Sequence, residues 1–180
     1  MLQTMRIVQF LSATCLLLTL LALPASAADR PFDLFSFFDG TARSEGIIEP
    51  LIGDTKDFTA RFQGEADGTR LRLVETFDFP EGRFEQIWKL RREGNRLSGT
   101  VRTEGEDGTL AEPVPVRGEL LPGGAVLSYD GYAPGGSETR FGFTHRMTAQ
   151  ENGAVENRVT ITKFLLPVAR SIVTFHPAGS

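Results

Sequence analysis

Residues that bind metals or form disulfides are scarce in this sequence. Its 180 residues include one cysteine and two histidines, which are too few for a Cys/His zinc site or a disulfide framework. An excess of basic residues is also absent, because 19 Lys and Arg stand against 23 Asp and Glu and give a formal net charge of −4. Nucleic acids and anionic membrane surfaces select clustered Lys and Arg, so the composition excludes them as the main partner. What remains, 41% hydrophobic and 23% charged residues, is typical of one globular domain.

Familiar catalytic motifs are missing as well. The sequence contains no Gly-x-Ser-x-Gly elbow, no P-loop, no Gly-x-Gly-x-x-Gly and no His-Glu-x-x-His, which are the patterns of hydrolases, nucleotide-binding proteins and metalloproteases. The segment Gly135-Gly136-Ser137-Glu138 is interpreted as a turn. The sequence therefore names no reaction, and we expect no cofactor and no metal.

The first residues have the pattern of a secretory signal peptide. Arg6 is the only charge, Ile7 to Leu23 is almost entirely apolar, and Pro24-Ala25-Ser26-Ala27 ends the segment. A charged start, an apolar core and a small-x-small site are the three parts of such a signal. We expect cleavage after Ala27, which leaves residues 28–180 as a single periplasmic domain without a transmembrane span. An uncleaved anchor helix is the alternative that the apolar length permits.

The chain from Gly40 onward alternates apolar and polar residues in short runs separated by Gly, Pro, Asp and Asn. This pattern indicates antiparallel strands joined by tight turns. About ten strands in one meander close on themselves because closure removes exposed edges, so we predict an all-β meander barrel with one short helical segment before it. The expected strands are Thr41–Glu49, Asp57–Gly64, Thr69–Phe79, Arg83–Arg91, Arg96–Thr103, Val114–Leu120, Ala125–Tyr132, Glu138–Gln150, Val155–Phe164 and Ala169–Phe175.

The expected helical segment is unusually aromatic. Phe32, Phe35 and Phe38 are spaced to share one face of a helical turn, and Leu34 and Phe37 lie beside them. Aromatic rings of this number must be covered. A plug under one end of the barrel is one interpretation, and an exposed lip that touches a ligand, membrane or partner is the other.

Several strands carry polar residues in otherwise apolar rows, which are found by taking alternate residues along each strand. A buried charge without a partner is costly, so these groups either pair, as Glu75 could with Lys163, or face a solvated or ligand-filled cavity. Each could also lie at a strand end or be satisfied by the backbone. The exceptions are Glu75 between Leu73 and Phe77, Gln86 between Phe84 and Trp88, His145 between Phe143 and Met147, and Asn157 and Lys163 in the row from Val155 to Leu165.

Five segments also occur in the order of a known family: Asp33-Leu34-Phe35-Ser36-Phe37-Phe38-Asp39-Gly40, Gly46-Ile47, Leu73-Val74-Glu75-Thr76-Phe77, Trp88-Lys89-Leu90 and Asn157-Arg158-Val159-Thr160-Ile161-Thr162-Lys163-Phe164. Together they resemble the DUF3833 family of bacterial envelope proteins over roughly residues 32–176. The resemblance implies a lipocalin/calycin-like barrel and, for some members, a link to enzymes that modify fatty acyl chains. Many members look like lipoproteins, but this chain lacks the lipobox cysteine. No catalytic residues carry over from the family, although Glu75, Trp88, Asn157 and Lys163 match its motifs.

These observations predict a periplasmic lipocalin-like protein that binds a hydrophobic or amphipathic small molecule, such as a lipid or fatty acyl chain. Its oligomeric state is left open. The expected aromatic wall consists of Phe77, Phe79, Phe84, Trp88, Phe141 and Phe143, and the expected head-group contacts are Glu75, His145, Asn157 and Lys163.

Two other functions compete with this one. A lipid-modifying enzyme would use Glu75 and His145 as an acid/base pair within hydrogen-bond reach, directly or through one water. A non-catalytic envelope interaction module would dock through the segment Phe32–Phe38, whose rings would then stay exposed.

Overall fold

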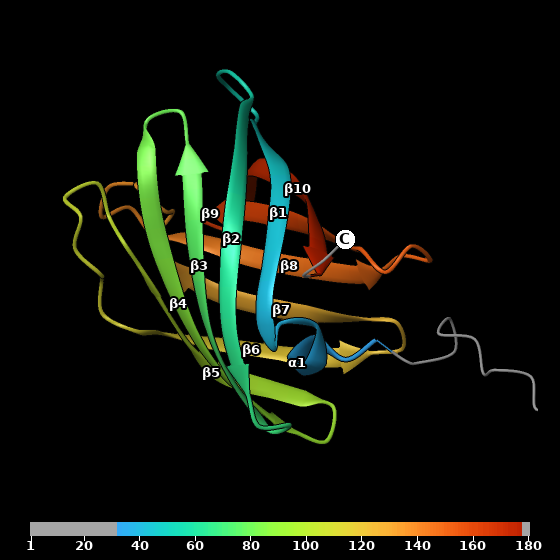
Figure 1. Cartoon of the computed structure of the whole chain (residues 1–180). Coiled ribbons are helices and arrows are strands. Elements are labelled where there is room, and N and C mark those ends of the chain that lie inside the picture. The colour runs from blue at the N-terminus through green and yellow to red at the C-terminus, as the bar shows by residue number, and fades with distance from the viewer. Residues whose placement is uncertain (1–31, 178–180) are drawn as a thin grey trace, which may run out of the picture.

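The computed structural model describes residues 32–177, so the predicted signal peptide, residues 1–27, lies outside them. The described residues form a closed antiparallel β-barrel with one short helix beside it (Figure 1). The predicted all-β barrel of ten strands is confirmed. In chain order the elements are α1 (Leu34–Phe37), β1 (Gly40–Pro50), β2 (Lys56–Ala66), β3 (Arg70–Phe79), β4 (Gly82–Glu93), β5 (Arg96–Thr103), β6 (Val114–Leu121), β7 (Gly124–Gly131), β8 (Phe141–Ala149), β9 (Val155–Lys163) and β10 (Leu166–Pro177).

Each strand pairs with its sequence neighbours, and β1 pairs with β10 to close the barrel. The closing register runs from Ala42 opposite Pro177 to Pro50 opposite Ala169. No strand of the described barrel is therefore left as an open edge, and the alternating strand pattern places one row of side chains inside and the other in water.

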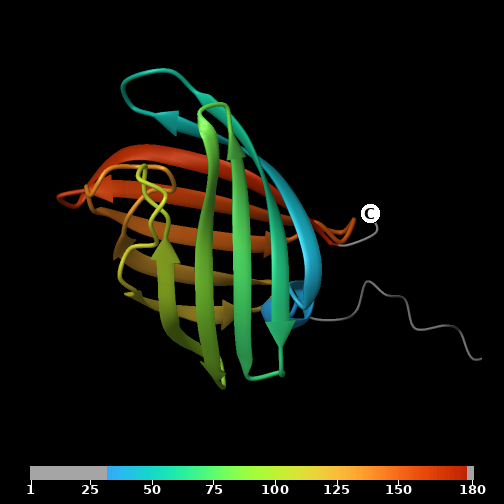
Figure 2. The ribbon, with the colours of Figure 1, turned by 60° about the vertical axis from the view of Figure 1, so that its left-hand side comes forward.

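The two ends of the barrel differ. Connections in an antiparallel meander alternate between the ends, so the loops β1–β2, β3–β4, β5–β6, β7–β8 and β9–β10 gather at one end, here named the mouth. Helix α1 lies at the opposite end, here named the plug end. Figure 2 shows α1 on the far side of the barrel from the β1–β2 and β9–β10 loops.

Asp33 fixes the position of α1 at the plug end. Its Oδ1 accepts hydrogen bonds from the backbone N–H of Phe35 at 2.8 Å and of Ser36 at 3.3 Å, which satisfies free donors of the first turn. Its Oδ2 accepts from Arg92 Nη1 of β4 at 2.8 Å, and the same guanidinium lies 5.1 Å from the centre of the Phe35 ring. One carboxylate thus caps the helix and ties it to the barrel wall.

The aromatic segment is a plug and is not an exposed lip. Phe35 is 0% and Phe38 2% exposed, and the Phe38 ring lies 5.2 Å from that of Phe62 and 5.4 Å from that of Phe175. Phe32 and Phe37 pack partly buried against the same core. The hypothesis of a docking module with exposed rings at Phe32–Phe38 is therefore wrong, because the barrel covers them.

Strand boundaries differ from expectation mainly at two places. The eighth strand begins at Phe141 and not at Glu138, because residues 132–140 form the β7–β8 loop. Leu165 was expected to continue an inward row, but it lies in the two-residue β9–β10 turn, where Leu166 already pairs with Lys163.

That turn has an unusual composition. Phe164 and Leu165 have φ values of 50° and 68° and are the non-glycine residues with positive φ among those described. Two-residue hairpin turns of this kind favour Asn-Gly, and a left-handed conformation costs roughly 1–2 kcal/mol for other residues. The barrel therefore retains two large apolar side chains at an unfavourable backbone conformation.

Replacement of Gly64 by alanine should loosen the plug. A Cβ at this position would overlap the carbonyl oxygen of Phe38, so the helix or β2 must move. We expect Gly64→Ala to lower the free energy of unfolding by about 1–3 kcal/mol in urea denaturation. Glu65→Ala, which changes the adjacent exposed residue of β2, is the control. Equal stability of the two variants would contradict the tight fit of plug and barrel.

Candidate functional site

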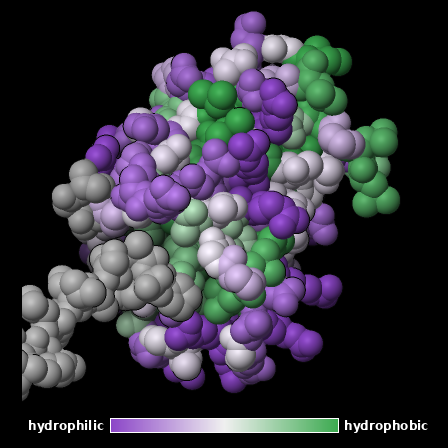
Figure 3. Space-filling view, turned by 90° about the vertical axis from the view of Figure 1, so that its right-hand side faces the viewer, coloured by the Kyte–Doolittle hydropathy of each residue, from purple (hydrophilic) through white to green (hydrophobic). Residues whose placement is uncertain are grey.

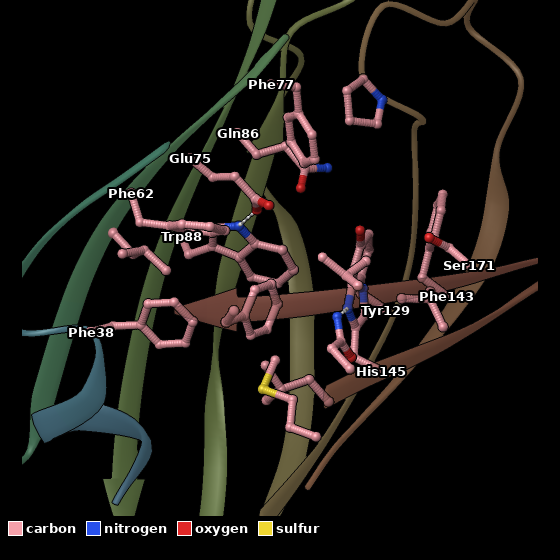
Figure 4. Close-up of a pocket in the computed structure, with 18 of the residues that line it drawn as sticks. Phe38, Phe62, Glu75, Phe77, Gln86, Trp88, Tyr129, Phe143, His145 and Ser171 are labelled. Atoms are coloured by element: carbon pink, nitrogen blue, oxygen red, sulfur yellow. Dashed lines mark hydrogen bonds between the residues drawn. The ribbon is translucent and has the colours of Figure 1, made fainter. Parts of the chain in front are cut away.

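A cavity of about 100 Å³ lies inside the barrel. Leu34 and Phe38 line it at the plug end, and the half-buried Ile48, Phe79, Pro134 and Ile161 line it toward the mouth. Figure 4 shows side chains from facing strands pointing into this space. The volume is smaller than an engineered apolar cavity of roughly 150 Å³ that accepts benzene, and far below the roughly 300–1,000 Å³ of drug-sized pockets.

Apolar and aromatic side chains make most of the wall. Phe77 and Phe79 stack at 5.6 Å between ring centres, and Phe58 lies 5.8 Å from Phe77. On the other side, Tyr129 stacks on Phe143 at 4.9 Å. The strands supply these rings because alternate residues of each strand face inward, so the wall favours hydrocarbon.

Glu75 of β3 is the carboxyl group inside this wall. It is 9% exposed, and its Oε2 accepts a hydrogen bond from Trp88 Nε1 at 3.1 Å (Figure 4). Burial raises the pKa of Glu75 to about 8, and the Trp88 hydrogen bond opposes this only in part. At neutral pH the group is therefore mainly an uncharged carboxylic acid, which can both donate and accept a hydrogen bond.

His145 of β8 and Asn157 of β9 form a second polar group. Asn157 Nδ2 and His145 Nδ1 are 3.2 Å apart, a contact in which the amide donates and the imidazole carries its proton on Nε2. Burial lowers the pKa of His145 to about 4, so the ring is neutral at pH 7. Neither His145 Nε2 nor Asn157 Oδ1 has a hydrogen-bond partner among the described residues. Such buried groups are rare in proteins.

The other polar groups of the wall are satisfied within the barrel. Gln86 Nε2 donates to Thr103 Oγ1 at 2.9 Å, and Ser171 Oγ donates to the carbonyl of Ile47 at 2.6 Å. Burial raises the pKa of Tyr129, and Gln86 opposes this only in part. The groups available to a ligand are thus Glu75 and the pair His145 and Asn157.

Six of the eight predicted site residues line the cavity: Glu75, Phe77, Trp88, Phe143, His145 and Asn157. Phe141 and Lys163 do not. Lys163 is the last residue of β9, and its Nζ lies 5.7 Å from the ring centre of Phe141 and 5.8 Å from that of Phe164. Of the expected wall, Phe79 lines the cavity, whereas Phe84 does not, and its ring centre lies 6.3 Å from that of Phe79.

The hypothesis of an ion pair between Glu75 and Lys163 is wrong. The side chain that bonds Glu75 is Trp88, and no salt bridge among the described residues involves either group. The row of β9 leaves the barrel interior after Ile161, which places Lys163 at the mouth.

Glu75 and His145 are not hydrogen-bonded to each other, so they do not form an acid/base pair by direct contact. The described hydrogen bonds join each to a different residue. The indole of Trp88 separates them, because its N–H bonds Glu75 while its ring meets the His145 ring edge-on at 5.7 Å.

Sequence reasoning left several lining residues out of the site. Tyr129 lies in the inward row of Ala125, Leu127 and Gly131, and Phe62 lies in that of Phe58 and Ala60. Both rows were visible as period-two patterns. What the sequence could not show was which rows face one another across the closed barrel.

The barrel should become less stable as the pH rises because of Glu75. Its pKa is raised from 4.5 to about 8, so the stabilisation from its bound proton is complete below pH 4.5 and is lost as the pH rises through about 8. Between pH 6 and pH 8 the wild type should lose about 2 kcal/mol of unfolding free energy that Glu75→Gln retains. Urea denaturation at both pH values measures this.

Glu65→Gln is the matched control, because it alters an exposed carboxylate on the adjacent strand β2. It should keep the pH response of the wild type. If Glu75→Gln loses as much unfolding free energy between pH 6 and pH 8 as the wild type, Glu75 is ionised in the folded protein. The conclusion that the cavity is uncharged would then be incorrect.

No helix among residues 32–177 is both long and apolar enough to cross a bilayer. These residues also contain no group of three or more His, Cys, Asp or Glu that could hold a metal ion.

Comparison with known proteins places the chain in a family. A search of curated proteins found no match. The family model described as "Protein of unknown function (DUF3833)" matches residues 22–177. The chain with the plugged ten-strand barrel therefore belongs to the DUF3833 family.

Proposed function

We propose that this protein binds an uncharged, mainly apolar small molecule inside the barrel, such as the end of a lipid chain that carries a hydroxyl, ester or protonated carboxyl group. The observation that carries this proposal is the set of unpaired polar atoms in an apolar wall. His145 Nε2 offers a donor and Asn157 Oδ1 an acceptor. Ligand sites typically combine apolar walls with a few convergent polar groups.

The charge state of the site favours a neutral ligand. Glu75 is protonated and His145 is neutral at pH 7, because burial raises the pKa of the first to about 8 and lowers that of the second to about 4. The cation predicted for the head group, Lys163, does not line the cavity. An ionised group inside would have no counter-charge, and burying it would cost several kcal/mol.

The size of the cavity restricts the part of a ligand that enters. At about 100 Å³ it holds a short or branched apolar group, and the remainder of a longer molecule would extend through the mouth. A lipid whose uncharged polar chain end enters the cavity, with the rest of the molecule and any charged head group outside the barrel, meets both conditions. The predicted lipid class is therefore retained, with the opposite orientation to the one first expected.

Location in the bacterial periplasm is part of the proposal. It rests on the signal-peptide pattern of residues 1–27. An exported carrier for apolar molecules would need neither metal nor disulfide, which fits the scarcity of His and Cys.

Ligands of equal chain length and different charge test the proposal. Trp88, the only tryptophan in the chain, lines the cavity, so its fluorescence reports occupancy. Titration at pH 7, where Glu75 is mainly protonated, with 1-octanol, octanoate and octylamine should show octanol binding about tenfold more tightly than either ion, because ions must be desolvated without a partner. Equal or tighter binding of octanoate would contradict a site for neutral groups.

Replacing the unpaired groups should separate binding from stability. In the double variant His145→Phe with Asn157→Leu, both partners of one hydrogen bond become apolar, which is often neutral or stabilising. We expect an unchanged or higher melting temperature and about tenfold weaker octanol binding. Lys163→Met, which alters a residue at the mouth, is the control and should bind octanol as the wild type does. If only Lys163→Met loses octanol binding, the ligand makes its polar contact at the mouth and not with His145 and Asn157.

A further inference from the structure

The exposed large hydrophobic side chains of the described residues are confined to two loops at the mouth. They are Leu51 and Ile52 in the β1–β2 loop, and Phe164, Leu165 and Leu166 at the β9–β10 turn, with exposed fractions of 73%, 93%, 87%, 94% and 68%. These five residues are here named the apolar tips. Hydrophobic side chains also project from the outline of the molecule in the space-filling view (Figure 3).

The two loops lie side by side. β1 pairs with β10, and beyond the last paired residues the backbone N–H of Leu51 donates to the carbonyl of Val168 at 2.9 Å. Leu166 and the turn continue from Val168 along the same edge of the mouth. The apolar tips thus lie on neighbouring loops at the mouth, although they are 113 residues apart in the chain when counted from Leu51 to Phe164.

The apolar tips follow shortly after cavity-lining residues in the chain. Ile48 of β1 and Ile161 of β9 line the cavity near the mouth, and the apolar tips begin three residues after each, at Leu51 and Phe164. A molecule leaving the cavity along these strands would pass from the apolar wall to the apolar tips, with Lys163 as the charged side chain beside this path.

The barrel itself does not need these side chains. Phe164 and Leu165 hold positive φ values that favour Asn and Gly, and at 87% and 94% exposure they make little packing contact in return. Residues that hold a strained backbone conformation and add little packing to the fold are typical of functional positions.

We propose that the apolar tips insert into the outer part of a lipid bilayer, so that the mouth of the cavity opens against the membrane. A fluid bilayer can surround two projecting loops, whereas a stable interface with a second copy takes about 20–30 residues from each partner and the tips supply five. Lys163 stands directly beside the turn, with its Nζ 5.8 Å from the Phe164 ring centre and no carboxylate partner among the described residues. When the apolar tips are inserted in the bilayer, the ammonium group of a lysine beside them can reach the lipid phosphates.

The contact is apolar in origin, which agrees with the net negative charge of the chain. It does not depend on what the cavity binds. If octanol does not bind, the proposed membrane contact is unaffected. If the tips do not insert into vesicles, the proposed ligand site in the cavity is unaffected.

Vesicle flotation of turn variants tests this inference. The exported chain, with its N-terminus established by mass spectrometry and identical in all variants, is mixed with vesicles of phosphatidylethanolamine and phosphatidylglycerol. Phe164→Asn with Leu165→Gly supplies the residues that the turn prefers. We expect the partition coefficient to fall about tenfold or more, while the melting temperature stays equal or rises. Asp54→Glu with Thr55→Ser, polar changes in the β1–β2 loop that keep its charge, is the control and should float as the wild type does.

A local probe separates insertion of the tips from any contribution of residues 1–31. Asp54→Cys in a Cys15→Ala background carries an environment-sensitive fluorophore next to Ile52. Its emission should shift to the blue on vesicles, and lipids brominated in the acyl chain should quench it. The inference is overturned if the probe stays in water, if the turn variant floats like the wild type, or if size-exclusion chromatography shows that the tips hold a dimer that the variant dissolves.

Discussion

The hydrogen bond from Trp88 to Glu75, inside a closed apolar barrel, sets the character of the whole interior. The indole satisfies one carboxyl oxygen at 3.1 Å, but burial outweighs it and raises the pKa of the group to about 8. The carboxyl is therefore uncharged at neutral pH and requires no counter-ion. The same indole separates Glu75 from His145, so two polar groups that could have formed an acid/base pair become two distinct hydrogen-bonding positions in a neutral cavity.

Barrel closure and the plug make that environment possible. Because β1 pairs with β10, the wall of the described barrel has no open strand edge, and α1 covers the plug end with Phe35 and Phe38. Asp33 links the helix cap to Arg92 of β4, so the cover is attached by a polar contact at the rim and by aromatic packing inside. Access remains at the mouth, where Ile48 and Ile161 lead outward to the apolar tips. In the proposed function, the plug end excludes solvent and the mouth exchanges with an apolar phase.

Local patterns in the sequence were sufficient for the fold. Alternation and turn residues located the strands closely, and the rows that contain Glu75, His145 and Asn157 were identified as inward-facing. Lys163 was misplaced, because period two continues in a sequence after the strand has left the interior. The ion pair with Glu75 was wrong for a related reason, since strand periodicity gives the face of a residue but not its height along the barrel axis. The apolar tips escaped notice because Leu165 fitted an inward row, and only the turn geometry shows that it faces water.

The central claim is that the interior is neutral at physiological pH, and the protonation state of Glu75 tests it most directly. Difference infrared spectroscopy of the wild type against Glu75→Gln, or carbon NMR of labelled glutamate, identifies a protonated carboxyl by its carbonyl signal. The account predicts a protonated Glu75 at pH 7 that ionises near pH 8. A carboxylate signal from Glu75 at pH 6 would show that the cavity holds a charge, and the case for an uncharged ligand would then fail.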